Sequence, residues 1–508
     1  MTHQTEQQWL EQVRALMLRG DFATAGSALG VALSGFPKSF ELRRVLAALH
    51  RQARREGEAE SLLRLLLDER PQDAGCAFAL AQLLIEQGRT RGAGEVLRRS
   101  FDGADPDANL AIHAIEMLDE ADRKSDAASI AEHATAAMPG DPRLHAYAGM
   151  LALQLGRFER AREHYLAALA QSPQACEWHA PQGLASAQRY SDAAHPDFAL
   201  FDACLQRSEL SGHARSTLLF ALGKAYDDVG DYAKAARYFR QANALAHSLT
   251  RWSRKAWRRT VEARLASAPM ARHAAAIDDF VPIFIVGIPR SGTTLLAELL
   301  SRYPGVCNRG EMPWIAKLSG RADLSGNLSE DALQGAASFY AAQTRRDDAP
   351  AARWFIDKQP LNFRYVDLIC ALFPHARIIH CTRNARDTAL SLWTQSFRED
   401  VQGYAYDFGD IATVMRDCAR LMAHWQSRCP QVISTVRYEQ LVAQPDRTLT
   451  TLAERIGITT SRVSAAGPSA SISTASLWQA RQPVHSASVQ RWRAYAPFVP
   501  ELLKFADA

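Results

Sequence analysis

The sequence predicts two folds in one chain: an all-α helical solenoid in the amino-terminal half, and an α/β domain with a central parallel sheet in the carboxy-terminal half. Two observations carry this prediction. Prolines recur at intervals of 34, 35, 33 and 34 residues from Pro37 to Pro173, within Ala- and Leu-rich segments of helical periodicity. Farther along, short apolar runs alternate with helical segments, as in a parallel sheet. With 508 residues, 47% of them hydrophobic, the chain can form two substantial cores.

The proline interval is that of the tetratricopeptide repeat, a helix-turn-helix unit that buries its faces only against its neighbours. Two copies carry the fuller pattern of small residues and an aromatic plug. These residues are Gly149, Gly156, Ala161, Tyr165, Ala168 and Pro173 in one copy, and Leu222, Gly223, Tyr226, Gly230, Ala235, Phe239 and Ala242 in the other. We therefore expect a tetratricopeptide-repeat array over residues 1–245, with a curved surface that can take a protein partner in its groove.

Two stretches depart from the repeat pattern. Between residues 174 and 213 the sequence suits either an insertion or a degenerate repeat, and both interpretations stay open. Residues 246–280 carry Trp252 and Trp257 and are expected to form capping or linker helices. The α/β domain is then predicted over residues 281–508.

The α/β domain is predicted from four strand-like runs separated by helical segments. The runs are Ile283–Gly287, Trp354–Ile356, Arg377–Cys381 and Val432–Val436. Ligands bind parallel sheets of this kind at the carboxyl ends of the strands. The motifs that follow such strands are therefore the candidates for a site.

A P-loop-like turn follows the first strand. Gly287 and Gly292 stand five residues apart, as in the nucleotide-binding P-loop, but Thr293 occupies the position of the lysine that would bind a γ-phosphate. Backbone N–H groups of residues 290–294, at the start of the next helix, can still surround a phosphate. The missing lysine argues against a kinase or nucleotide triphosphatase, which remains the alternative enzyme class.

The segment Pro289–Thr294 resembles the loop that binds the 5′-phosphosulfate of 3′-phosphoadenosine 5′-phosphosulfate (PAPS) in sulfotransferases. A second block, the strand Ala376–Thr382 followed by Arg383 and Ser391, is similar to the family's pair for the donor's 3′-phosphate. A guanidinium at a strand end and a hydroxyl two helical turns later can converge on one phosphate. The resemblance implies PAPS as co-substrate, bound by Arg290, Ser291, Gly292, Thr293, Thr294, Arg383 and Ser391.

Two further segments resemble the tyrosylprotein sulfotransferases. Gly310-Glu311 matches a Gly-Glu step whose glutamate is the proposed general base, a role that suits a carboxylate beside an acceptor hydroxyl. Lys358 lies in an Asp-Lys-x-Pro segment whose lysine contacts the leaving phosphate, a task that Arg290 is expected to share. Fixed cations at the leaving group would carry much of the rate enhancement, and the scheme needs no metal.

The tail also resembles this group, so that the similarity spans about residues 281–495. Ser476 aligns with a serine of the active centre, and Arg491 stands where the relatives have a lysine near the 3′-phosphate. A role outside the active site stays open for three of these residues: Glu311 as a surface carboxylate, Lys358 as a solvated lysine and Ser476 as a loop hydroxyl. His380 lies inside an apolar strand and is expected to be a packed residue rather than a base.

Composition completes the prediction. No apolar run is long enough to span a membrane and the first residues are polar, so a cytoplasmic protein is expected. Eight cysteines without a C-x-x-C pair are expected to be reduced thiols. The net charge of +4 argues neither for nor against nucleic acid, and no such partner is predicted.

The leading function is transfer of a sulfuryl group from PAPS to a hydroxyl or amine acceptor, and the peptide or protein tyrosine and the small hydroxyl compound stay open as acceptors. The other alternative is an inactive scaffold whose repeats recruit partners. Self-association also remains open.

Overall fold

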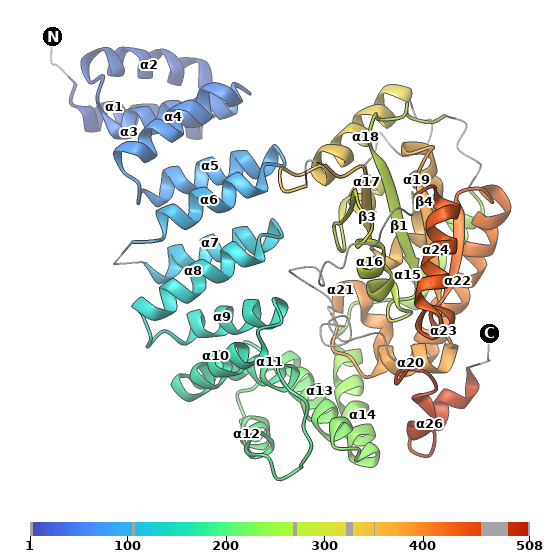
Figure 1. Cartoon of the computed structure of the whole chain (residues 1–508). Coiled ribbons are helices and arrows are strands. Elements are labelled where there is room, and N and C mark those ends of the chain that lie inside the picture. Colours follow the sequence, from blue (N-terminus) through green and yellow to red (C-terminus); the bar gives the residue numbers. More distant parts are fainter. Residues whose placement is uncertain are drawn as a thin grey trace. The chain divides into compact units, whose positions relative to one another are not determined.

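The computed structural model describes residues 4–103, 107–267, 272–321, 329–349, 351–397, 399–458 and 486–505. These residues form two compact units (Figure 1). One unit contains the residues up to Tyr147 together with Arg345–Asp348, and the other contains Ala148–Thr344 together with the residues from Ala349 onward. The second unit therefore holds both the last helices of the repeat array and the whole parallel sheet. The domain limits at 245 and 281 stay predictions.

Helices that pack in consecutive pairs build the repeat array. They are α1 (Glu6–Leu18), α2 (Phe22–Gly35), α3 (Phe40–Gln52), α4 (Glu56–Glu69), α5 (Ala74–Glu86), α6 (Thr90–Ser100), α7 (Ala108–Glu120), α8 (Lys124–Ala137), α9 (Pro142–Gln154) and α10 (Phe158–Gln171). Pro37, Pro71, Pro139 and Pro173 each lie in the connection after such a pair, where proline ends a helix. The predicted period is thus the period of the helix pairs.

Local sequence explains why each pair forms. The first helix of a pair begins after a side chain that accepts a hydrogen bond from the backbone three residues on, as Ser39 does from Leu42 and Asp73 from Cys76. The second helix carries an alanine with no exposed surface at every thirty-fourth position. These alanines are Ala25, Ala59, Ala93, Ala127 and Ala161. A methyl group at this position lets the paired helices pack closely.

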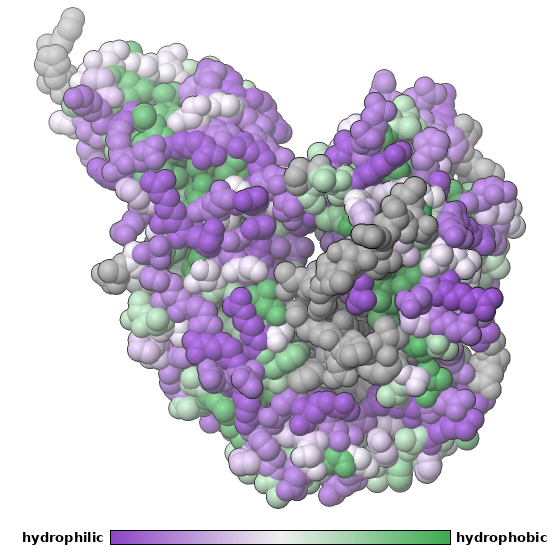
Figure 2. Space-filling view, viewed as in Figure 1, coloured by the Kyte–Doolittle hydropathy of each residue, from purple (hydrophilic) through white to green (hydrophobic). Residues whose placement is uncertain are grey.

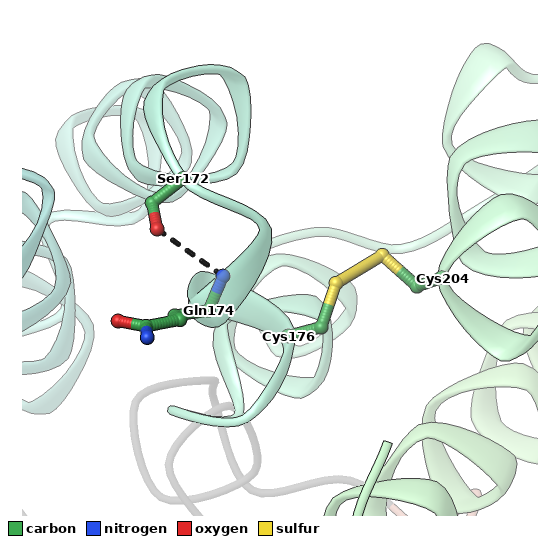
Figure 3. The surroundings of a disulfide bond; sticks show 4 residues. All are labelled: Ser172, Gln174, Cys176 and Cys204. Carbon is green, nitrogen blue, oxygen red and sulfur yellow. Dashed lines mark hydrogen bonds between the residues drawn. A yellow bond between two sulfur atoms is a disulfide. The ribbon is translucent and has the colours of Figure 1, made fainter. Parts of the chain in front are cut away.

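The segment between 174 and 213 contains three short helices, η1 (Pro173–Cys176), α11 (Ala180–Ser186) and α12 (Pro196–Leu205). A disulfide joins Cys176 in η1 to Cys204 at the end of α12 (Figure 3). The expectation that all eight cysteines are thiols is therefore wrong for this pair. The fold brings the two Cα atoms to 6.4 Å, a proximity that a separation of 28 residues does not reveal.

The array ends with a regular helix pair, α13 (Gly212–Asp228) and α14 (Tyr232–Leu249), and a further helix, α15 (Arg254–Leu265). A Cβ added at Gly223 would lie 2.6 Å from the Phe239 ring, so the aromatic plug needs glycine opposite it. The α15 helix corresponds to the predicted cap, and Trp257 in it donates from Nε1 to Asp417 at 3.0 Å. The last helices are thus joined to the α/β domain through a shared core.

Five parallel strands form one sheet in the order β2-β3-β1-β4-β5. The strands are β1 (Val281–Gly287), β2 (Val306–Asn308), β3 (Trp354–Asp357), β4 (Arg377–Thr382) and β5 (Ile433–Arg437). The helices are α16 (Thr293–Leu300), α17 (Trp314–Ser319), α18 (Glu330–Thr344), η3 (Pro360–Tyr365), α19 (Val366–Leu372), α20 (Ala385–Trp393), α21 (Glu399–Gln402), η4 (Gly403–Tyr406), α22 (Phe408–Arg428), α23 (Tyr438–Ala443), α24 (Pro445–Ile456), α26 (Trp492–Tyr495) and η5 (Pro500–Lys504). The predicted fold class, a helical array followed by a parallel-sheet domain, is confirmed.

Helices cover both faces of the sheet (Figure 1). Ile283 and Ile285 of β1 pack with residues of α16 and α24, while Phe284 and Val286 pack on the other face with residues of α18, α19 and α22. This alternation follows from the two-residue period of a strand. Because β1 pairs with β3 on one side and β4 on the other, the sheet order reverses at β1, and a ligand crevice is expected at its carboxyl end.

Apolar side chains also reach the surface at the start of the array. Figure 2 shows them over the first helices, where Leu18, Phe22 and Val31 are 90%, 38% and 60% exposed. No helix among the described residues is both long and apolar enough to cross a membrane.

Candidate active site

The turn between β1 and α16 requires its glycines. Gly287 has φ +141° and a Cβ there would lie 2.4 Å from the carbonyl oxygen of Cys381 on β4. Gly292 has φ +97° and a Cβ there would lie 2.5 Å from Cδ2 of Tyr438. Both positions combine a left-handed backbone with close packing, so any side chain would displace the neighbouring strand end.

This turn forms an anion-receptive site. The α16 helix begins at Thr293 without a side-chain cap, so the positive end of its dipole faces the turn. The Oγ of Ser291 is buried and has no hydrogen-bond partner among the described residues. A buried hydroxyl without a partner is costly, and a phosphate oxygen would supply the missing partner. Thr294 lies in the first turn of the same helix.

Three of the predicted donor-binding residues meet at the ends of β1 and β4. The Nε of Arg290 donates to the Oγ of Ser391 on α20 at 3.0 Å. The Nη1 of Arg383 donates to the carbonyl oxygen of Arg290 at 3.0 Å. Arg290 itself has φ +72°, unusual for a residue with a side chain. The contacts from Arg383 and Ser391 therefore hold the turn in a conformation that the isolated chain would disfavour.

Three arginine side chains bring positive charge together at this point. Burial, together with the nearby charges of Arg383 and Arg491, lowers the pKa of Arg290 to about 10. Burial also lowers the pKa of Arg383, whose Nε is buried without a hydrogen-bond partner among the described residues. Guanidinium groups in such a cluster pair well with phosphate oxygens. The donor set therefore fits a nucleotide with more than one phosphate group.

Tyr438 is a further site residue that sequence reasoning missed. It directly follows β5, and its ring centroid lies 4.7 Å from the Arg383 guanidinium, within cation–π range. Its ring also packs where a Cβ of Gly292 would lie, so it supports both the turn and the arginine. Its position at a strand end in a parallel sheet was the signal that could have identified it.

Glu311 and Lys358 form an ion pair at the end of β3. The Nζ of Lys358 donates to Oε1 of Glu311, and the Lys358 backbone N–H donates to the Gly310 carbonyl at 2.8 Å. The lysine is 2% exposed and the glutamate side chain 35% exposed. The carboxylate is therefore open to an incoming molecule while the ammonium is buried beneath it, a pairing that the sequence did not predict.

Asp357, the last residue of β3, is hydrogen-bonded beside the Glu311–Lys358 pair. Its carboxylate accepts from the Tyr340 hydroxyl at 2.9 Å and from the Met312 backbone N–H at 3.4 Å. Burial raises the pKa of Asp357 to about 7, although the bonds from Tyr340 and Met312 and the charge of Lys358 oppose the rise. The carboxyl group connects the loop that carries Glu311 to β3.

Asn308 connects that loop to α16, the helix that follows the glycine turn. Asn308 donates from Nδ2 to Oε1 of Glu298 on α16 at 2.9 Å, and its Oδ1 accepts from the Gly310 backbone N–H at 3.0 Å. The helix that begins at the anion site and the loop of the candidate base are thus braced against each other.

Of the two site residues predicted in the tail, the structure describes Arg491 but not Ser476. Ser476 lies outside the described residues. Arg491 lies close enough to Arg290 and Arg383 to lower the pKa of both. Its Nη2 donates to Asp227 on α13.

Two parts of this chain are similar to known protein families. Residues 282–462 match the sulfotransferase family model, and residues 216–246 match a tetratricopeptide repeat. An uncharacterized protein of Aquifex aeolicus is 28% identical over 313 residues, 57% of this chain and 41% of its own length. Protein-tyrosine sulfotransferase 1 of Danio rerio is 24% identical over 195 residues, 35% of this chain and 54% of its own length. Among solved structures, the sulfotransferase domain of the Synechococcus olefin synthase is 21% identical, with a TM-score of 0.31 over 45% of this chain and 90% of that domain.

The resemblances predicted from the sequence, to sulfotransferases and to tetratricopeptide repeats, are thereby confirmed. The chain spans about half the length of the curated relatives it matches.

Proposed function

We propose that this protein transfers a sulfuryl group from PAPS to a hydroxyl or amine acceptor. The observation that carries the proposal is the grouping of a glycine turn, half-buried arginines and a partly exposed carboxylate at the carboxyl ends of three adjacent strands. Arg290 lies beyond β1, Lys358 at the end of β3 and Arg383 beyond β4. Phosphate receptors and a proton acceptor are then on one edge of one sheet.

The donor would be held mainly through its phosphates. Backbone N–H groups at the start of α16 and the Ser291 hydroxyl would receive the 5′-phosphosulfate, with Thr293 and Thr294 beside them. Arg383, Ser391 and Arg491 would receive the 3′-phosphate. PAPS supplies the sulfuryl group and departs as 3′,5′-adenosine bisphosphate. The buried Nε of Arg383, which has no hydrogen-bond partner among the described residues, supports its assignment to the 3′-phosphate.

Arg290 and Lys358 would stabilise the negative charge that develops on the leaving phosphate. Lys358 is buried and Arg290 is half-buried, and a fixed charge acts more strongly in such surroundings than in solution. Lys358 is held by Glu311 in place, so little reorganisation is needed when the charge develops.

Glu311 would accept the proton of the acceptor. Its carboxylate is anchored through Oε1 by Lys358 and remains partly exposed, so a hydroxyl group can approach it. As the acceptor oxygen bonds to sulfur, its proton passes to Glu311. The contacts of Asp357 and Asn308 would keep this loop in register with the donor turn.

We propose a peptide or protein tyrosine as the first acceptor class to test. The relative from Danio rerio is named a protein-tyrosine sulfotransferase, and a repeat array commonly binds extended peptides. Carbohydrate, lipid and small phenolic hydroxyls are the next classes, because a carboxylate base can serve each of them.

The test is product formation. The full chain, incubated with PAPS and a tyrosine peptide, should release 3′,5′-adenosine bisphosphate and give a peptide heavier by one SO₃ group, and the matched phenylalanine peptide should remain unchanged. Transfer to a sugar or phenol but not to the peptide would redirect the acceptor assignment. Absence of bisphosphate release with every acceptor class would contradict the proposed reaction.

A further inference from the structure

The side chain of Arg491 is anchored on the repeat array. Asp227, near the end of α13, accepts from Nη2 of Arg491 through Oδ2 and from the Tyr495 hydroxyl through Oδ1 at 2.5 Å. Both oxygens of this carboxylate are therefore directed at the carboxy-terminal segment. The Asp227 side chain is only 16% exposed, so the contact is sheltered from competing water.

The backbone around Arg491 is fixed from a different element. Asp387 on α20 accepts from the Gln490 backbone N–H at 2.7 Å and from the Trp492 backbone N–H at 3.0 Å. Gln490 has φ +61°, so the chain turns sharply just before the arginine. Contacts with the α/β domain thus fix the backbone position of Arg491, and the contact with α13 fixes the position of its guanidinium.

The chain just before Arg491 contacts the candidate donor site, because Arg383 donates from Nη2 to the Ser488 carbonyl at 2.5 Å. The charge of Arg491 also lowers the pKa of both Arg290 and Arg383. For Arg491, burial lowers the pKa, but attraction to Asp227 and Tyr495 outweighs this and raises it. The arginine therefore stays charged, and Asp227 occupies one end of a fork that offers five N–H groups.

We propose that Asp227 is a positioning residue for the donor, through which the last repeat holds Arg491 at the 3′-phosphate. The inference rests on the proposed function, because it takes PAPS as the donor. It assigns the repeat array a part in the donor site itself, beyond recruitment of a partner. A carboxylate that fixes an arginine lowers the entropy lost when the arginine then binds a phosphate.

The test compares nucleotides with and without the 3′-phosphate. The full chain and Asp227→Asn are titrated calorimetrically with 3′,5′-adenosine bisphosphate and with adenosine 5′-phosphate. We expect Asp227→Asn to bind the bisphosphate about tenfold more weakly, as for loss of a charged hydrogen bond, and to bind the monophosphate as the unaltered chain does. Asp228→Asn, which removes the neighbouring ion pair with Lys224, is the matched control and should change neither affinity.

Coupling and folding are tested with two more variants. In Arg491→Gln, the further change Asp227→Asn should have no added effect on bisphosphate affinity, because its target is gone. Tyr495→Phe removes one hydrogen bond to Asp227 but keeps the Asp227–Arg491 ion pair, so it should lower bisphosphate affinity less than Asp227→Asn does. This milder variant keeps the inference testable if Asp227→Asn unfolds.

Three results would overturn the inference. If Asp227→Asn lowered the affinity for both nucleotides equally, Asp227 would be a structural residue. If the variant bound the bisphosphate as tightly as the unaltered chain or more tightly, Asp227 would only compete with phosphate for Arg491. Failure of the unaltered chain to bind the bisphosphate would remove the proposed function together with the inference, and so differs from failure of the inference alone.

Discussion

The Nε of Arg290 and the Oγ of Ser391 lie 3.0 Å apart in a hydrogen bond, although the two residues belong to different strand–helix units. Arg290 lies in the turn after β1, and Ser391 lies in the helix after β4. The bond joins the two halves of the proposed donor site across the switch point of the sheet. The bond therefore holds the two candidate phosphate-binding segments next to each other.

Replacement of Arg383 with alanine should weaken the binding of 3′,5′-adenosine bisphosphate by roughly 2 kcal/mol, as expected for loss of a charged hydrogen-bonding partner. Calorimetric titration measures the change. Arg377→Ala is the control, because Arg377 begins the same strand at the opposite edge of the sheet and donates to the Ile456 carbonyl. Equal affinity in Arg383→Ala and the unaltered chain would rule out this residue as a 3′-phosphate ligand.

Replacement of Glu311 with glutamine should reduce turnover by roughly a hundredfold or more, because a positioned base is lost, while bisphosphate affinity stays near normal. Steady-state rates with PAPS and calorimetry measure the two quantities separately. Glu330→Gln alters an exposed glutamate at the start of α18 and should leave both unchanged. Normal turnover in Glu311→Gln would remove this residue from the proton transfer.

Alanine at Gly287 should destabilise the protein more than alanine at Gly305. Both glycines have positive φ, which costs a side-chain residue roughly 1–2 kcal/mol. At Gly287 the new Cβ also collides with the Cys381 carbonyl, whereas at Gly305 it would lie 3.9 Å from the Ala351 carbonyl oxygen, an ordinary contact. Thermal unfolding measures the difference, and equal melting temperatures would show that the turn relaxes without cost.

Asp357 should make the protein less stable as the pH rises from about 4 to about 7. Burial raises its pKa from 3.8 to about 7, so between these values the folded chain retains a proton that the unfolded chain has lost. This stabilisation is complete below the unfolded pKa and is lost as the pH passes through about 7.

The variant Asp357→Asn tests this dependence, since it cannot release that proton. Its melting temperature should fall less than that of the unaltered chain over the same pH range. Asp446→Asn, an exposed carboxylate on α24, controls for loss of an acidic residue. An identical fall in Asp357→Asn and the unaltered chain would show that Asp357 does not carry the effect.

Most of the fold could be predicted because most of its elements have a local signal in the sequence. The proline interval gave the repeat period, and apolar runs located β1, β3, β4 and β5. The strand β2 was not predicted, because Val306–Asn308 is too short for a periodic pattern and pairs only with β3 at the sheet edge.

The candidate site residues were predicted from sequence motifs and from their resemblance to a known family, which do not reveal contacts between distant segments. Arg290 and Arg383 were found in this way, whereas the pairing of Glu311 with Lys358 joins residues 47 apart and depends on the register of the sheet. The contact between Asp227 and Arg491 was not predicted either, because the tail returns to a repeat helix 264 residues earlier. Hydrophobic periodicity describes single helices and strands, so it does not reveal a contact between such distant segments.

The most direct test of the account is calorimetric titration of the full chain with 3′,5′-adenosine bisphosphate beside ATP with magnesium. We predict tight binding of the bisphosphate and none of ATP, because Arg383, Ser391 and Arg491 would receive a 3′-phosphate that ATP lacks, and Thr293 replaces the P-loop lysine. Binding of ATP alone, or of neither nucleotide, would contradict a PAPS site at the end of β1.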